Sequence, residues 1–452
     1  MTLLNELSAE VCQRARMSRD PRFDGRFFVA VKTTGIFCRP ICPANLPKEE
    51  NVEYFSSQAL AVSAGYRPCL RCRPESAPHS WAWKGAETTF LRALTLIEQG
   101  ELDGSLETLA SRLGISDRYL RQLFQRHLGM PPKQYAQIQQ LMFAKQLLHT
   151  SQISITEVAY ASGFQSTRRF NDAFQKLFRL TPTQVRRERA ALPSRNHLSL
   201  AFRGPFDWAH MLDSYRLRAI EGMELVDEQS YQRHFVLGEG TGWFKASMAQ
   251  SHLDIEFEME RLSDLRHLVA RLRRMFDLDA DLISIEAHLE QLAPGLVRRT
   301  GIRIPGVWNA WEAGVRAVLG QQVSVKAAIG QLNLLVSTLA ASEGSTRYFP
   351  TPEQVQMSDL SFLRMPERRK ETLKRLADYV RLHPMDSPMA WLSLSGIGLW
   401  TVDYAQLRGE SRSHCFLTGD LIVKKALAKF PQLTAESVAP WGSYATFHCW
   451  SH

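Results

Sequence analysis

Apolar residues recur at helical spacing through the middle of the first half of the chain, and the pattern occurs twice. The segments SLETLASRLGISDRYLRQLFQRHLGMPPKQY (105–135) and SITEVAYASGFQSTRRFNDAFQKLFRLTPTQV (154–185) match at an offset of about 50 residues. Each has an apolar helix, a glycine that permits a turn (Gly114 or Gly163) and a second helix that ends before a proline. We therefore expect two similar helix-turn-helix units.

After residue 195 the hydrophobic pattern changes from helical spacing to alternation. Residues 198–204, 234–240, 242–250 and 252–260 alternate apolar and polar positions and predict strands, with a helix over 208–221. From about residue 262 to the end the spacing is helical again. The pattern predicts a small α+β layer followed by an all-α lobe, with a linker at 343–352 inside the lobe.

Two stretches without periodicity mark the domain boundaries, at 73–80, which is rich in Pro and Ser, and at 186–194. With 452 residues, the chain is long enough for several domains. We predict a multidomain, mainly α protein with α+β parts, divided as 1–80, 81–190, 195–283 and 284–452.

The positive charge of the chain lies entirely in its first part. The net charge is +9, and residues 1–190 account for all of it with 26 Lys and Arg against 17 Asp and Glu. A basic part of this kind favours a polyanionic partner, and we expect double-stranded DNA. There is no run of about 18 apolar residues and no secretory leader pattern, so we expect a cytoplasmic, nucleoid-associated protein that does not contact the membrane.

Four of the seven cysteines lie in two close pairs, Cys38-x3-Cys42 and Cys69-x2-Cys72. This spacing suits a tetrahedral four-thiolate zinc site, and a purely structural zinc site is the alternative that spacing alone leaves open. Basic residues surround the pairs, which would attract a DNA phosphate: Lys32, Arg39, Arg67, Arg71 and Arg73. We expect the other three cysteines, Cys12, Cys415 and Cys449, to be buried thiols.

Residues 20–74, which include FDGRFFVAVKTTGIFCRPICPANLPKEENVEYF and GYRPCLRCRP, resemble the N-terminal domain of the Ada adaptive-response family. The resemblance implies that the zinc-bound cysteine of the FCRP motif, here Cys38, takes a methyl group irreversibly from a DNA methylphosphotriester. Zinc keeps the thiol deprotonated, and methylation changes the formal charge of the site from −2 to −1. The resemblance therefore implies a switch to tighter DNA binding. The Pro-Cys-His-Arg motif of the family's second methyltransferase domain has no counterpart here, so we do not expect direct reversal of alkylated guanine.

Residues 86–189 resemble the DNA-binding domain of AraC-type regulators, which contains two helix-turn-helix units. Arginine can pair with guanine edges, and Gln or Asn with adenine. The second helix of each unit carries such side chains, namely Arg118, Arg121, Gln122 and Gln125, then Thr167, Arg168, Arg169 and Asn171. We expect these helices to read DNA, with RNA polymerase as a candidate second partner.

The segment Leu394-Ser-Gly-Ile-Gly-Leu-Trp-Thr-Val-Asp-Tyr404 has the form of a helix-hairpin-helix, in which Gly396 and Gly398 bring backbone N–H groups near a phosphate. An acidic residue, Asp420, follows about 20 positions later. As an alternative, Asp420 is the N-cap of the next helix, and both roles are compatible because capping holds the carboxylate still. Asp403 is the rival acid, which we expect on the polar face of the second helix.

With VRAVLGQQVSV (315–325), the hairpin segment resembles the helix-hairpin-helix superfamily of DNA glycosylases, and residues 200–452 resemble the AlkA family of inducible 3-methyladenine glycosylases most. The resemblance implies a small α+β (TBP-like) domain, beginning GPFDWAHML, in front of the glycosylase lobe. It assigns the catalytic carboxylate to Asp420, a base pocket to Trp400, Tyr404 and Trp441, and DNA contacts to Gly396, Gly398, Thr401, Gln321 and Gln322. Electron-rich rings suit cationic bases such as 3-methyladenine and 7-methylguanine.

Two positions separate this chain from other glycosylases. Trp400 stands where strand-cleaving members carry a lysine nucleophile, so we expect a monofunctional enzyme. Gln322 stands where the AlkA pattern has an apolar wedge, which leaves the range of lesions open. We expect a monomeric fusion of sensor, transcriptional activator and glycosylase. Two alternatives stay open: an activator whose last lobe only binds DNA, and a repair enzyme whose first half only targets damage.

Overall fold

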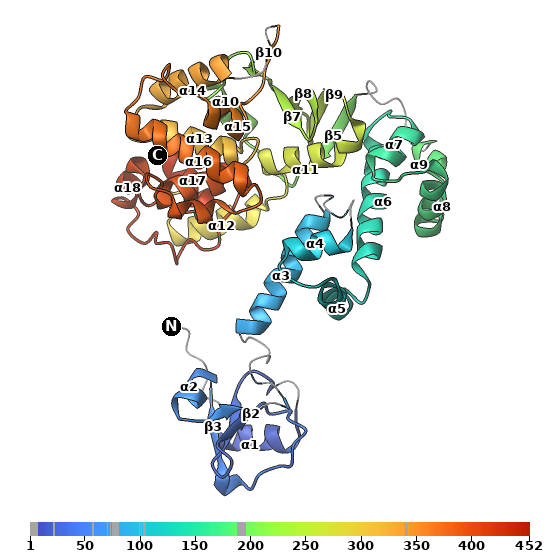
Figure 1. The fold of residues 1–452 in the computed structure, drawn as a ribbon, viewed down its shortest axis with the longest axis vertical. Helices are drawn as coiled ribbons and strands as arrows, with labels where there is room; N and C mark the ends of the chain where they lie inside the picture. The colour runs from blue at the N-terminus through green and yellow to red at the C-terminus, as the bar shows by residue number, and fades with distance from the viewer. Residues whose placement is uncertain are drawn as a thin grey trace. The chain divides into compact units, whose positions relative to one another are not determined.

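A computed structural model of the chain describes residues 8–20, 23–56, 58–69, 71–72, 74, 81–98, 100, 102, 105–187, 196–339, 342–344 and 346–452. The two stretches without periodicity that were predicted to separate domains, 73–80 and 186–194, fall largely outside these residues. The chain forms two compact units, Met1–Gln139 and Gln140–His452, and each is described by itself (Figure 1).

The first unit begins with a small four-stranded sheet. Helix α1 (Ala9–Met17) precedes β1 (Phe28–Val31), β2 (Ile36–Cys38), η2 (Glu49–Asn51), β3 (Val52–Phe55), α2 (Gln58–Ser63) and β4 (Arg67–Pro68). The strand order is β3-β1-β2-β4, with β2 and β4 parallel, so that Phe37 lies opposite Pro68. Successive side chains of a strand point to opposite faces. Val29 packs with Cys12 on one face, and Phe28 and Ala30 pack with Phe37 on the other.

The first helix-turn-helix unit follows as α3 (Trp81–Glu98), α4 (Leu106–Arg112) and α5 (Asp117–Leu128). Ser105 and Ser116 cap the starts of α4 and α5 with their side-chain oxygens. Between these helices Gly114 has a φ of +68°, a left-handed conformation that favours glycine. Helix α6 (Pro132–Thr150) comes next, and the division between the two units falls within it.

The second helix-turn-helix unit repeats this construction with α7 (Ile155–Ala161), α8 (Thr167–Phe178) and α9 (Pro182–Arg187). Ser154 and Glu157 form a reciprocal capping box at the start of α7. Gly163 has a φ of +86° at the turn. The predicted pair of similar units, each with a glycine turn, is confirmed.

A five-stranded antiparallel sheet follows residue 195, formed by β5 (His197–Ala201), β6 (Glu224–Val226), β7 (Ser230–Leu237), β8 (Gly240–Met248) and β9 (His252–Met259). Its strand order is β5-β9-β8-β7-β6. Helices α10 (Trp208–Arg216) and α11 (Leu265–Met275) accompany it, and η4 (Leu262–Asp264) leads into α11. The four predicted strands and the helix are present, whereas the three-residue β6 was not predicted because it is too short to alternate visibly.

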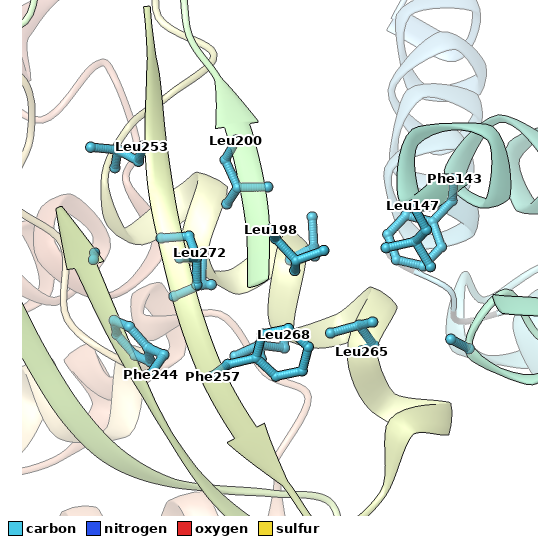
Figure 2. Close-up of a cluster of buried hydrophobic side chains, with 14 of the residues drawn as sticks. Phe143, Leu147, Leu198, Leu200, Phe244, Leu253, Phe257, Leu265, Leu268 and Leu272 are labelled. Carbon is cyan, nitrogen blue, oxygen red and sulfur yellow. The ribbon is translucent and has the colours of Figure 1, made fainter. Parts of the chain in front are cut away.

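The sheet and α11 share one hydrophobic cluster. Leu198 and Leu200 of β5, and Phe257 of β9, lie beside Leu268 and Leu272 of α11 (Figure 2). All five side chains are buried. The apolar positions of the predicted alternating pattern therefore form the inner face of this sheet.

The last lobe is helical, as predicted, and apart from one short hairpin no strand occurs among its described residues. Its elements are α12 (Leu282–Leu292), α13 (Ala310–Gly320), α14 (Val325–Leu339), β10 (Ser342–Glu343), β11 (Thr346–Arg347), α15 (Pro352–Met357), α16 (Glu367–Leu382), η5 (Pro388–Ser393), α17 (Leu399–Glu410), α18 (Leu421–Leu427) and α19 (Gly442–Trp450). The hairpin β10–β11 lies where the linker was predicted. Within the described part of the chain, no helix combines the length and apolar character that a membrane span requires.

Candidate functional site

The four cysteines predicted as metal ligands come together at one end of the small sheet. Their Sγ atoms all lie within 4.8 Å of one another. Cys38 ends β2, and the backbone N–H of Cys69 donates to the carbonyl of Phe37 at 3.0 Å, which ties the second pair to the first. A ZnS₄ tetrahedron with bonds of about 2.3 Å needs sulfurs about 3.8 Å apart, so the cluster suits zinc.

The residue after Cys38 anchors the cluster. The Arg39 guanidinium forms a two-point ion pair with the buried carboxylate of Asp24. The same guanidinium donates to the carbonyl of Cys72 at 3.3 Å, and the Arg39 backbone N–H donates to the Cys72 sulfur at 3.4 Å. Cys42 is buried, whereas Cys38, Cys69 and Cys72 are partly exposed.

The other basic residues near the cluster differ in their surroundings. Arg67 and Arg71 are exposed, and Lys32 lies 3.8 Å from Glu53. Arg73 lies outside the described residues. The cysteines away from the cluster, Cys12, Cys415 and Cys449, are buried as predicted.

The predicted DNA-reading side chains lie on the outer faces of α5 and α8. Arg118, Arg121, Gln122 and Gln125 are exposed and line one shallow hollow together with Pro131. Arg168, Arg169 and Asn171 are exposed on α8. Both helices bury phenylalanines on the opposite face, so the polar face of each is free to meet a groove.

The predicted hairpin joins η5 to α17 and is fixed from two sides. Gly396 has a φ of +93°, and a Cβ there would lie 2.1 Å from the Thr372 hydroxyl oxygen, so only glycine fits. Gln321, at the end of α13, donates from Nε2 to the Gly396 carbonyl at 3.1 Å and to Thr401 Oγ1 at 3.3 Å. Gly398 is the N-cap of α17.

Gln322 is exposed and has a φ of +56°, which is uncommon for a residue other than glycine. It directly follows Gln321, whose side chain is engaged with the hairpin. Gln322 is therefore an exposed side chain next in sequence to the residue that holds the hairpin.

Asp420 is held by three donors at the start of α18. Its Oδ1 accepts from the backbone N–H groups of Ile422 at 2.8 Å and Val423 at 3.1 Å, which confirms the capping interpretation. The same oxygen accepts from the indole Nε1 of Trp450 at 3.1 Å. The carboxylate is thus fixed and only partly buried.

The loop that carries Asp420 is braced by α19. The Ser443 hydroxyl oxygen accepts from the Cys415 N–H at 3.1 Å, and the Thr446 hydroxyl oxygen from the Leu417 N–H at 3.2 Å. A Cβ on Gly442 would lie 2.6 Å from the His414 carbonyl oxygen, so this approach requires glycine. These contacts fix the position of the loop and, with it, the position of the Asp420 carboxylate.

Trp400 and Tyr404 are brought together as predicted, with ring centroids 5.3 Å apart and planes at 27° on α17. Trp441 packs against the same hydrophobic cluster as these two rings. It precedes α19 and packs its ring edge-on against His288, with ring centroids 4.9 Å apart. Trp450, nine positions later, lies about 13 Å further along the helix.

Sequence reasoning thus missed Trp450, the aromatic residue that touches Asp420. Its position at the end of the last helix, 30 residues after Asp420, leaves no local pattern that links the two. The rival acid Asp403 is half-buried, and burial raises the pKa of its carboxyl, while His414 acts in the opposite direction.

Known families match three regions of the chain. The metal-binding domain of Ada matches residues 11–75, a helix-turn-helix domain matches 109–188, and the AlkA N-terminal domain matches 197–309. The matches agree with the zinc cluster, the paired helical units and the five-stranded sheet.

Some curated relatives match a part of this chain, and another matches nearly all of it. DNA-3-methyladenine glycosylase 2 of Escherichia coli is 33% identical over 56% of this chain and 96% of its own length. The bifunctional transcriptional activator/DNA repair enzyme Ada of the same species is 35% identical over 38% of this chain and 47% of its own length. A probable bifunctional transcriptional activator/DNA repair enzyme AlkA of Mycobacterium tuberculosis is 34% identical over 98% of this chain and 96% of its own length. The chain therefore belongs to the family of AlkA-type bifunctional transcriptional activators and DNA repair enzymes, with an Ada metal-binding domain at its front.

Proposed function

We propose that the chain is a DNA alkylation repair and response protein. Its last lobe is a monofunctional glycosylase of the 3-methyladenine type, which hydrolyses the N-glycosidic bond of alkylated bases such as 3-methyladenine and 7-methylguanine. Its first part senses methylphosphotriesters and activates transcription. The observation that carries the excision activity is the carboxylate of Asp420, fixed by two backbone N–H groups and Trp450.

In the excision step, Asp420 supplies negative charge where positive charge develops. As the base leaves, the sugar becomes oxocarbenium-like, and a fixed carboxylate stabilises that cation without having to reorganise. Water then adds to the sugar, and Asp420 can orient it. The donors to Oδ1 hold the carboxylate but leave its other oxygen for the sugar or the water.

The aromatic residues form the pocket for the flipped base. Trp400 and Tyr404 stack on one another along α17. Trp450 of α19 donates its indole N–H to the carboxylate of Asp420. We assign the pocket to these three rings, with Trp450 in the place first given to Trp441. Alkylated purines carry a positive charge, which electron-rich rings attract.

The DNA around the lesion is held by the hairpin. The backbone N–H groups near Gly396 and Gly398 can contact phosphate, while Gln321 and the buried Thr401 keep the hairpin in place. Gln322 fills the space left by the flipped base.

The front module transfers a methyl group to itself. The Cys38 thiolate attacks the methyl carbon of the phosphotriester, the carbon–oxygen bond breaks, and the phosphate leaves as an ordinary diester. Cys38, Cys42, Cys69 and Cys72 would hold zinc, which keeps the thiols deprotonated at neutral pH. Loss of one thiolate charge then reduces repulsion from the DNA backbone.

The methylated protein acts as an activator at promoter DNA, read by Arg118 and Arg121 of α5 and by Arg168 and Arg169 of α8. We take RNA polymerase as its candidate partner and propose that it acts as a monomer in the cytoplasm, at the nucleoid. The four domains are 1–80, 81–190, 195–283 and 284–452.

A base-release assay on methylated duplex DNA tests the excision activity. The proposal requires free methylpurines and intact strands that break only after alkaline treatment. If no base is released while the lobe still binds DNA, the chain is an activator with a DNA-binding lobe instead. Direct strand cleavage would contradict the monofunctional assignment.

A further inference from the structure

A network of buried charges lies between the sheet and the helical lobe. Arg233 of β7 pairs with Glu224 at 2.8 Å and with Glu312 of α13. Arg316 pairs with Glu312 at 2.8 Å and with Glu224 at 3.2 Å. Two guanidiniums thus meet two carboxylates, and this network is neutral by itself.

Two further guanidiniums lie beside this network without a carboxylate of their own. Arg408 of α17 is 1% exposed, and its Nε, Nη1 and Nη2 have no hydrogen-bond partner among the described residues. Arg218 is partly exposed, donates to the Ser214 carbonyl at 3.1 Å and acts electrostatically on Tyr404. Its own carbonyl accepts from Arg316 at 2.9 Å. A fully buried guanidinium without a counter-charge is costly, so Arg408 in particular requires an anion nearby.

Tyr404 is the neighbour of both of these guanidiniums. Trp400, Tyr404 and Arg408 follow one another every four residues on α17, which places them in one column. The Arg408 Cζ lies 5.8 Å from the centroid of the Tyr404 ring. One surface of the column therefore belongs to the base pocket, and the other is charged.

The electrostatics of the Tyr404 hydroxyl follow from these neighbours. Burial raises its pKa, but Arg408, Arg218 and Arg316 together outweigh burial and the opposing Glu312, so that the pKa lies below the ordinary value for tyrosine. Glu224 and Arg233, the other charged groups of the cluster, pair within the neutral network. A neutral tyrosine would leave two guanidiniums to repel a cationic base from its own pocket.

We propose that Tyr404 works as a phenolate, held in that form by Arg218 and Arg408, and that its negative charge makes the pocket prefer positively charged purines over neutral ones. The phenol proton passes to solvent through the partly exposed pocket. Arg218 and Arg408 are positioning residues in this proposal, because they act on the base through Tyr404. It rests on the proposed excision function for its substrate, but the ionisation can be measured without any excision.

The near-ultraviolet absorbance of phenolate tests the ionisation in the full-length protein. The difference between wild type and Tyr404→Phe should show one tyrosinate at a pH well below about 10, where ordinary tyrosine ionises. Arg408→Met, which keeps the length of the side chain and removes the charge, should move this transition to higher pH. If the wild-type and Tyr404→Phe curves differ only in the range of ordinary tyrosine, the proposal is overturned.

Two matched controls accompany this titration. Tyr444 is also buried, but its hydroxyl donates to Asp277 at 3.0 Å and its pKa is raised. Tyr444→Phe should therefore leave the low-pH tyrosinate signal unchanged. Arg412→Met removes an exposed guanidinium that pairs with Glu410. It should leave the pH of the tyrosinate transition unchanged. Loss of the signal in either control would contradict the assignment to Tyr404 and Arg408.

Excision of a cationic and a neutral purine tests the consequence for specificity. Tyr404→Phe and Arg408→Met should each reduce the preference for 7-methylguanine over hypoxanthine by about tenfold. An unchanged preference in both variants would overturn the role in specificity. If the tyrosinate signal is present but the wild type releases no base, the ionisation stands and the excision function is what fails.

Discussion

The zinc module and the excision site achieve their chemistry by different constructions. The four cysteines come from two short segments within 35 residues, and their sulfurs lie within 4.8 Å of one another. The proposed excision site instead combines the end of α13, the hairpin before α17, the loop before α18 and the last residue of α19. A reactive centre made from a local motif depends mainly on its own ligands. A centre assembled from distant elements depends also on the contacts that hold those elements in place.

This contrast explains what could be predicted from the sequence. The cysteine spacing predicts a tetrahedral site almost alone, whereas the role of Asp420 is implied by the resemblance to the AlkA family, with the glycine pair as local support. Trp450 could not be found this way, because its contact with Asp420 spans 30 residues and depends on how α19 packs. Arg408 was overlooked for a similar reason, since helical spacing does not indicate that an arginine is buried without a partner.

Removal of zinc should have the largest effect and should separate the two sites completely. A chelator that strips the metal removes the force holding four thiolates together, so methyl uptake from phosphotriester DNA should disappear. Base release should stay within about twofold, because distant sites with no shared partners act almost independently. Mass spectrometry for the methyl group and a base-release assay on the same sample measure both. Loss of both activities would show that the excision site depends on the module.

Asp420→Asn should have the next largest effect. Asn caps a helix about as well as Asp, so melting temperature should barely change, but the charge facing the sugar is lost. Base release should fall by about two to three orders of magnitude, while binding to an abasic analogue stays within a few-fold.

Asp403→Asn is the matched control for that experiment, since Asp403 is a half-buried acid on α17. It should leave excision largely intact. A loss of activity by Asp420→Asn that only follows a drop in melting temperature would reduce its role to capping.

Trp450→Phe tests whether the last residue of α19 braces the carboxylate. Phenylalanine keeps most of the ring packing and removes the indole donor at 3.1 Å. Because a hydrogen bond to a charged group contributes about 1.5 to 3 kcal/mol, base release should fall roughly ten- to hundredfold. Trp441→Phe, which removes an indole that packs against His288 instead, should change the rate little. If base release falls equally in both variants, Trp441 belongs to the base pocket as first predicted.

The smallest expected effect concerns stability and again involves α19. His448 is 1% exposed, and burial, followed by His210 and His452, lowers its pKa to about 4. In the unfolded chain, a histidine gains its proton near pH 6.5, so acidification favours unfolding from there down to about pH 4. Between pH 7 and 5.5 the wild type should lose about 1 kcal/mol of unfolding free energy through this residue.

Denaturant titrations at the two pH values measure that loss. His448→Gln, which cannot gain a proton, should lack it, whereas His383→Gln removes an exposed imidazole and should keep it. A His448→Gln variant with the pH dependence of the wild type would remove His448 as its cause.

The most direct test of the whole account is a crossed measurement on Cys38→Ser and Asp420→Asn, with methyl uptake and base release assayed for each variant. We expect Cys38→Ser to take up no methyl group and to release bases at the normal rate. Asp420→Asn should take up one methyl group per chain, on Cys38, and release almost no base. Loss of both activities in either variant, or a methyl group found on Cys69 in the Asp420→Asn protein, would contradict two separate reactive centres at Cys38 and Asp420.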